Sequence, residues 1–285
     1  MKAPFSFFDI FPKLPKVHVV DVGAMPIEGH NEIYLPLITA NRAKLTAFEP
    51  DQAAFLGLEK ALGAPHRVFP YFVGDGRPAT FHVNSSPMTS SLYPPNDSVV
   101  ALFPDVSPHM KVQTRHAVET KRLDDIAEIE RIDFLKLDVQ GAELDVLKGG
   151  VLKLAQTLVI HTEVEFVPLY VGQPLFGDID VFLRAQGFQF HTFTGLAKRF
   201  MAPLASPPGK PGGINQMLWA DAVYMRDPLT LHHLAPERRL LLAALMHELY
   251  DSVDVALYII KSLAEAGEAV DYGRYVQRLQ REGFA

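Results

Sequence analysis

Four acidic side chains at the ends of predicted β-strands are the groups in this sequence best placed to do chemistry. They are Asp21, Glu49, Asp138 and Glu163. In an open parallel sheet, the carboxyl ends of the strands face one ligand crevice. Each acid taken alone also suits the N-cap of a helix, but capping does not account for all four together. We therefore expect the four carboxylates to line a single site.

The first of these strands opens into a loop that contains glycines. The segment reads VHVVDVGAMPIEG over residues 17–29. A glycine lets the backbone approach a ligand closely, but a dinucleotide site needs three spaced glycines, so that a pyrophosphate can rest on a helix N-terminus. This loop instead places Pro26 and Glu28 before Gly29, and the sequence contains no GxxxxGK[ST] phosphate loop. The pattern favours a nucleoside ligand without phosphates.

Glu49 identifies that ligand further, because it ends the second strand in the segment KLTAFEP, residues 44–50. An acid at this position can accept hydrogen bonds from both hydroxyls of a ribose. Both NAD and S-adenosylmethionine carry such a ribose, but only the second lacks a pyrophosphate. S-Adenosylmethionine is therefore the favoured cofactor. An NAD-dependent oxidoreductase is the second hypothesis, and a non-catalytic binding or assembly protein is the third.

The sequence resembles the FkbM family of methyltransferases over residues 17–226. The matching motifs are VVDVGA at 19–24, AFEP at 47–50, SSL at 90–92, RLDDI at 122–126 and DFLKLDVQGAELDVLKGG at 133–150, and the likeness continues over 163–188. The resemblance implies a Rossmann-like sheet of about seven strands with helices on both faces. It also implies S-adenosylmethionine as cofactor and O-methylation of a hydroxyl on a sugar, a glycan or another small molecule.

The expected cofactor-contacting residues follow from the positions of these motifs. They are Asp21, Gly23, Ala24, Glu49, Pro50, Asp75, Ser91 and Asp138. The resemblance assigns the first three to the methionine part of the cofactor and Glu49 to its ribose. It assigns Asp75 to the adenine side and Ser91 to the pocket wall. The loop before Gly29 is longer than is usual in the family, so Gly29 is not assigned.

Methyl transfer to a hydroxyl requires alignment of oxygen, methyl and sulfur, and secondarily removal of the hydroxyl proton. Glu163 is the leading candidate for the proton acceptor or substrate-orienting group, and Asp138 should lie near the cationic part of the cofactor. His161 shares a face with Glu163 because side chains two residues apart point the same way, although a lone histidine among apolar residues is typical of a core. Glu165 is interpreted as solvated. Asp138, Glu163 and His161 could also hold Mg²⁺, but no spacing supports this, and no metal is predicted.

The elements around these residues form an alternating pattern that predicts a mostly parallel sheet with an antiparallel closing pair. Strands are predicted at residues 17–21, 44–50, 66–75, 77–85 (as a hairpin arm), 133–137, 157–166, 189–196 and 215–227. Helices are predicted at 31–40 (with a bend or late start at Pro36), 51–63, 142–147 and 178–186. The polar segment 85–98 and the connection 203–213 are predicted loops, which could contact the acceptor or be ordinary surface loops.

A change in pattern near residue 228 divides the chain. We predict a methyltransferase domain over 1–227 and a C-terminal helical extension over 228–285, with breaks at Gly267 and Gly273. The broad apolar faces of these helices predict packing on the sheet domain or on a second copy of the chain, as a homo-oligomer.

The composition excludes several classes of partner and site. The 285 residues include 27 basic and 33 acidic side chains, giving a net charge of −6 and no electrostatic footprint for nucleic acid. The absence of cysteine excludes disulfides and thiolate metal sites. No apolar run approaches the roughly 20 residues that span a bilayer, and the N-terminal segment lacks the pattern of a signal peptide. We expect a cytoplasmic protein, without membrane insertion, that acts on a small-molecule or glycan acceptor.

Overall fold

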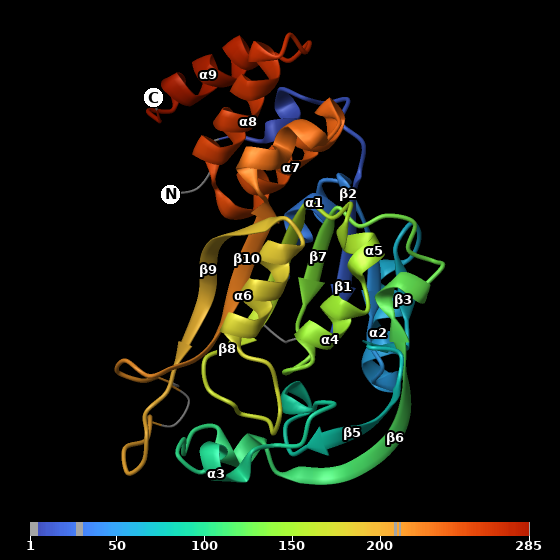
Figure 1. The fold of residues 1–285 in the computed structure, drawn as a ribbon, viewed down its shortest axis with the longest axis vertical. Helices are drawn as coiled ribbons and strands as arrows, with labels where there is room; N and C mark the ends of the chain where they lie inside the picture. The colour runs from blue at the N-terminus through green and yellow to red at the C-terminus, as the bar shows by residue number, and fades with distance from the viewer. Residues whose placement is uncertain (1–4, 27–30, 208–209, 211, 285) are drawn as a thin grey trace.

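The computed structural model describes residues 5–26, 31–207, 210 and 212–284. A seven-stranded sheet with the order β3-β2-β1-β7-β8-β10-β9 forms its centre (Figure 1). Its strands are β1 (Val17–Val22), β2 (Ala43–Phe48), β3 (Arg67–Phe69), β7 (Phe134–Leu137), β8 (Val159–Glu165), β9 (Phe188–Lys198) and β10 (Met217–Arg226). β10 is antiparallel to β8 and β9, and the other neighbouring pairs are parallel. The predicted fold class and the antiparallel closing pair are confirmed.

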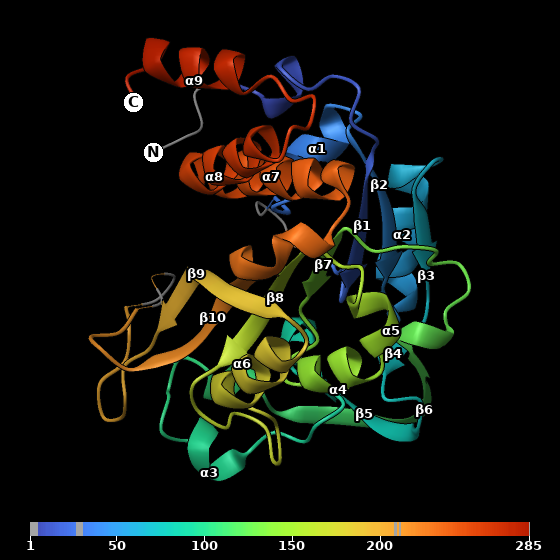
Figure 2. The ribbon, with the colours of Figure 1, turned by 45° about the horizontal axis from the view of Figure 1, so that its top comes forward.

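Helices cover both faces of the sheet because its strands are apolar on both faces. One core joins Val17 and Val19 of β1 to the helices α1 (Leu35–Thr39), α7 (Pro236–Tyr250) and α8 (Val253–Glu265). Figure 2 shows α7 and α8 beside α1. The second core joins Val20 and Val22 to α4 (Glu143–Lys148), α5 (Val151–Leu154) and α6 (Phe176–Ala185). Alternate side chains of β1 thus enter opposite cores, as the pleat of a strand requires.

The helix boundaries follow local sequence signals. α2 (Gln52–Leu62) begins after Asp51, whose side chain accepts a hydrogen bond from Ala54 N at 2.8 Å, and it ends at Gly63 with φ of +57°. An aspartate N-cap and a terminal glycine thus mark the two ends of the helix predicted at 51–63. α1 begins at Leu35 instead of residue 31, with Pro36 in its first turn, where a missing N–H costs no helical hydrogen bond. This late start of α1 agrees with the prediction made from Pro36.

The predicted strand at 66–75 and its hairpin arm are wrong in detail. The segment is divided at Pro70 into β3 and β4 (Phe72–Gly74). β5 (Pro78–Asn84) does not pair with β4, because β6 (Val112–Arg122) lies between them in a separate three-stranded sheet. β6 was not predicted, since most of its side chains are exposed and show no apolar alternation. Figure 1 shows β5 and β6 crossing below the large sheet, close to the short α3 (Asp97–Val100).

The chain after residue 227 is helical, as predicted, and ends in α9 (Tyr272–Arg281). Gly267 follows α8 with φ of +82°, whereas Gly273 lies in the first turn of α9 and is not a break. The helices α7–α9 share a core with the sheet and with Phe7 of the N-terminal 3₁₀ turn η1 (Phe7–Asp9). The division into domains at residue 228 and the homo-oligomer stay predictions. Among the described residues, no helix has both the length and the apolar character needed to cross a bilayer.

Candidate active site

A cavity of about 740 Å³ lies at the carboxyl ends of β1, β2, β7 and β8. The predicted site residues that line it are Gly23, Glu49, Pro50, Asp138, His161 and Glu163. The predicted site residues outside its lining are Asp21, Ala24, Asp75 and Ser91. The predicted loop over 85–98 also contributes, since residues 86–90 and 92 line the cavity. Strand tips and this loop therefore enclose one space.

Gly23 is the point at which the tips of three strands meet. Its N–H donates to the carbonyl of Phe48 at the end of β2, and the N–H of Asp138 donates to the carbonyl of Val22, each at 3.0 Å. Gly23 has φ of +87°, and a Cβ on it would lie 1.9 Å from the carbonyl oxygen of Asp138. Only glycine suits both this backbone conformation and this contact. Residues 27–30 of the same loop, including Glu28 and Gly29, lie outside the described residues.

Glu49 presents one carboxylate oxygen to the cavity. Its side chain is 3% exposed, and Oε1 accepts a hydrogen bond from Asp51 N at 2.8 Å. Within the described part of the chain, Oε2 has no hydrogen-bond partner. Burial raises the pKa of Glu49 to about 7, against the opposing effect of the Asp51 N–H. Glu49 is therefore an acceptor with an unused oxygen whose charge changes near neutral pH.

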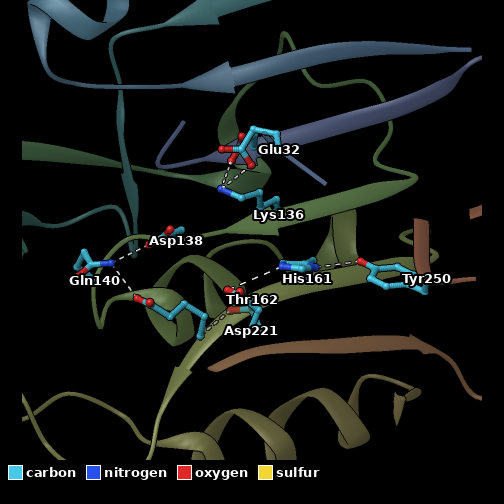
Figure 3. Close-up of polar contacts among 10 residues, drawn as sticks. Glu32, Lys136, Asp138, Gln140, His161, Thr162, Asp221 and Tyr250 are labelled. Carbon is cyan, nitrogen blue, oxygen red and sulfur yellow. Dashed lines mark hydrogen bonds and ion pairs between the residues drawn. The ribbon is translucent and has the colours of Figure 1, made fainter. Parts of the chain in front are cut away.

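Asp21 is buried beside Lys136, away from the cavity. It accepts hydrogen bonds from Tyr34 Oη at 2.5 Å and from Lys136 Nζ at 3.4 Å. Lys136 also pairs with Glu32 at 3.3 Å and lines the cavity (Figure 3). Burial opposes the charge of Lys136, but these acids raise its pKa overall. Asp21 thus holds in place a lysine that lines the cavity.

Gln140 joins the carboxylates at the tips of β7 and β8. Its Nε2 donates to Asp138 Oδ1 at 2.7 Å and to Glu163 Oε2 at 2.8 Å (Figure 3). The second oxygen of each carboxylate, Asp138 Oδ2 and Glu163 Oε1, has no hydrogen-bond partner in the described ranges. Burial and nearby carboxylates hold the pKa of Glu163 well above its ordinary value. The two acids therefore stand side by side, each with one fixed oxygen and one unused oxygen.

His161 and Glu165 complete the row of side chains on β8. His161 Nδ1 lies 3.0 Å from Tyr250 Oη, and its Nε2 lies 3.8 Å from Asp221 Oδ1 (Figure 3). Burial, followed by the charge of Lys136, lowers the pKa of His161 to about 3, so it is neutral at physiological pH. Glu165 is not solvated as predicted: it is 2% exposed, and its buried Oε2 has no partner in the part of the chain described.

The remaining predicted residues occupy supporting positions. Ser91 Oγ donates to the carbonyl of Gln140 at 2.6 Å, so it braces the loop that carries Gln140. Asp75 pairs with Arg77, and Ala24 is buried in the core beside Gly23. Across the described ranges, no three histidine, aspartate or glutamate side chains are arranged to hold a metal ion.

Sequence reasoning missed several residues of the cavity. Lys136, Gln140 and Asp221 all line it, as does Arg199, whose guanidinium lies 4.5 Å from the centre of the Trp219 ring. Lys136 carried a usable signal, because a lysine between two leucines of a buried strand requires an acidic partner. Gln140 carried none, since nothing in the spacing places its amide between residues on two strands.

Comparison with known proteins agrees with the resemblance found in the sequence. The model of the methyltransferase FkbM domain matches residues 21–190. The 2-O-methyltransferase NoeI of Sinorhizobium fredii (strain NBRC 101917 / NGR234) is 34% identical over 150 residues, which are 49% of this chain and 61% of that protein. The chain thus spans about three fifths of the length of this curated relative.

Two solved structures are more distant. One, described as a methyltransferase from Thermoplasma acidophilum, has 11% identity and a TM-score of 0.36 over 75% of this chain and 70% of that one. The other, the 23S rRNA methyltransferase ErmE, has 13% identity and a TM-score of 0.33 over 96% of both chains. Likenesses this weak support no argument about function. The family match, by contrast, covers more than half of the sequence, and this chain therefore belongs to the FkbM family of methyltransferases.

Proposed function

We propose that this protein is an S-adenosylmethionine-dependent O-methyltransferase that acts on a hydroxyl of a glycan or a sugar-like small molecule. The observation that carries the proposal is one cavity lined by Glu49, Asp138 and Glu163, each of which has one carboxylate oxygen without a hydrogen-bond partner among the described residues. Membership of the FkbM family supports methyl transfer. The name of the relative, a 2-O-methyltransferase, supports a hydroxyl as the acceptor.

The lining of the cavity suits S-adenosylmethionine. Glu49 Oε2 can accept hydrogen bonds from both ribose hydroxyls, and Gly23 lines the same cavity. Phe48 and Tyr71 line the cavity near Glu49 as stacked rings, which suits a flat base. The carboxylates of Asp138 and Glu163 suit a ligand that carries ammonium and sulfonium charges. These carboxylates and aromatic rings therefore fit S-adenosylmethionine, which has no phosphate group to bind.

The side chains of this protein would position the acceptor and remove its proton. When bound, the cofactor supplies an electrophilic methyl group on a sulfonium. Glu163 Oε1, which has no hydrogen-bond partner among the described residues, would take the proton of the acceptor hydroxyl during the transfer. A base is most effective when its pKa lies near the working pH. Burial and nearby carboxylates raise the pKa of Glu163 and so make it a stronger base than an ordinary carboxylate, whereas burial lowers the pKa of His161 to about 3 and makes it a weaker one.

The ribose assignment predicts a pH dependence of binding. The pKa of Glu49 is raised to about 7, so this carboxyl is ionised above pH 7 and gains a proton as the pH falls. The ionised form of Glu49 accepts hydrogen bonds more strongly. Affinity for S-adenosylhomocysteine should therefore be highest above pH 7 and should weaken as the pH falls below 7. From pH 8 to pH 6 we expect about a tenfold rise in Kd, measured by calorimetry.

Two variants and one control ligand make this test of the proposed function specific. Glu49→Gln should bind more weakly at pH 8 and lose the pH dependence, whereas Glu59→Gln on the exposed surface of α2 should behave as the natural protein does. The ribose assignment is wrong if Glu49→Gln keeps the full pH dependence. Stabilisation by NAD without any response to S-adenosylhomocysteine would instead restore the oxidoreductase hypothesis.

A further inference from the structure

We propose that Gln140 is a positioning residue that clamps Asp138 and Glu163 through one oxygen each, so that the other oxygens face the cofactor and the acceptor hydroxyl. The inference rests on the proposed function and deepens it.

The hydrogen bonds of the Gln140 amide fix its orientation. Nε2 has two N–H groups, and it donates to Asp138 Oδ1 at 2.7 Å and to Glu163 Oε2 at 2.8 Å. Ionised carboxylates only accept hydrogen bonds, so the NH₂ group must face them. On the other side, Oε1 lies 3.2 Å from the hydroxyl of Tyr170, whose single proton is shared between Oε1 and the carbonyl of Thr89 at 2.9 Å. Both ends of the amide therefore have partners, and its donors are committed to the two acids.

The backbone at Gln140 is held in a conformation that non-glycine residues rarely adopt. Its φ is +55°, and that of the following Gly141 is +99°. Ser91 Oγ donates to the carbonyl of Gln140 at 2.6 Å, while the N–H groups of Val139 and Gly141 donate to Glu143 Oε1 at 2.9 and 3.2 Å. A left-handed residue persists where its surroundings fix it, and such positions cluster at functional sites. The loop is thus built to place the Gln140 side chain.

A neutral donor is the chemistry that this position needs. The charged groups near Glu163 are the carboxyls of Asp138, Glu143, Glu165 and Asp221, from the β7 tip, α4, β8 and β10. Lys136 on β7 is already paired with Asp21 and Glu32, and His161 on β8 is neutral. An acid at position 140 would add to the repulsion, and a cation would cancel the negative charge that suits a sulfonium. A neutral amide donates a hydrogen bond to each carboxylate and leaves their negative charge unchanged.

The test compares the affinities of the full chain for S-adenosylmethionine and S-adenosylhomocysteine by calorimetry between pH 6 and pH 9. The ribose is common to both ligands, so the effect of Glu49 cancels in the ratio, which reports the sulfonium charge. The natural protein should lose its preference for S-adenosylmethionine as the pH falls and Glu163, whose pKa is raised by burial and nearby carboxylates, takes up a proton. Glu163→Gln should flatten this profile.

Removing the clamp should move the midpoint of that profile. In Gln140→Leu the two acids lose their shared donor, so Glu163 should keep its proton to higher pH and the midpoint should rise by about one pH unit, which is about a fivefold loss of preference at the original midpoint. Gln140→Glu keeps the side-chain length and adds a third carboxyl, so its midpoint should rise as well. Gln113→Leu and Gln113→Glu, at an exposed position of β6, should leave the midpoint unchanged.

The outcomes separate the two proposals. A natural protein that binds neither ligand contradicts the proposed function itself. A natural protein that binds both, with midpoints unchanged in folded Gln140→Leu and Gln140→Glu, overturns the clamp and leaves the proposed function standing. Thermal unfolding of each variant identifies those that are folded. Leucine and glutamate differ in polarity and charge, so the same shift of the midpoint in both variants excludes a packing defect as its cause.

Discussion

Replacing Glu163 by Gln is expected to lower the turnover number by about 10²–10⁴-fold, the usual contribution of a general base. The substitution keeps the size of the side chain but removes the carboxylate that would take the hydroxyl proton. Glu163 faces the cavity beside Asp138, and its Oε1 is unused by the described protein groups. Affinity for S-adenosylhomocysteine should change little, because that ligand carries no sulfonium charge. The measurement is release of S-adenosylhomocysteine in the presence of a panel of methyl glycosides.

A matched control is Glu119→Gln on the exposed face of β6, which makes the same chemical change away from the cavity and should turn over normally. Turnover should also rise with pH in the natural protein as Glu163, whose pKa is raised, loses its proton. Undiminished turnover by Glu163→Gln would show that Glu163 does not act as the base. The rate enhancement would then come from the alignment of the acceptor oxygen with the methyl group and the sulfur.

Replacing Gly23 by Ala should abolish cofactor binding and destabilise the fold. The new Cβ would meet the carbonyl oxygen of Asp138 at 1.9 Å, and φ of +87° is unfavourable for any other residue. Relief requires that the tips of β1 and β7 separate, which moves Asp138 and the loop to Gln140. We expect a loss of about 2–4 kcal/mol in the free energy of unfolding, from backbone strain and overpacking. The measurements are urea unfolding and calorimetry with S-adenosylhomocysteine.

Gly57→Ala provides the control, because a Cβ at that position of α2 would meet nothing within 4 Å. Alanine there should stabilise the helix by about 0.5–1 kcal/mol. A Gly23→Ala protein that binds S-adenosylhomocysteine as tightly as the natural chain would show that the junction of the three strands does not shape the cofactor site.

The sequence predicted the sheet well because its buried strands carry a strong local signal. β1 and β7 are apolar runs that end in acids, and α2 has both an N-cap and a terminal glycine. β6 has no such signal, since its side chains are mostly exposed and its pairing with β4 and β5 depends on contacts about 30–50 residues away. The pattern of local burial therefore predicted the central sheet and missed the smaller one.

Of the residues in the candidate site, the sequence predicted mainly the acidic ones. Positions at strand tips placed Glu49, Asp138 and Glu163 together, because parallel strands end at one edge. The partners of these acids come from elsewhere: Lys136 pairs with Asp21 across 115 residues, and Gln140 reaches Glu163 across 23. Asp21 was assigned to the cofactor because it sits in the motif, but the pleat turns it into the core beside Tyr34. Such details depend on side-chain direction, which spacing along the chain does not specify.

A crystal structure of the full chain with S-adenosylhomocysteine tests the central claim most directly. We predict the ribose hydroxyls within hydrogen-bonding distance of Glu49 Oε2 and the sulfur beside the unused oxygens of Asp138 and Glu163, with open space next to it for an alcohol. A ligand bound elsewhere, or one whose ribose and sulfur contact none of these three carboxylates, would contradict the assignment of this cavity as the site of methyl transfer.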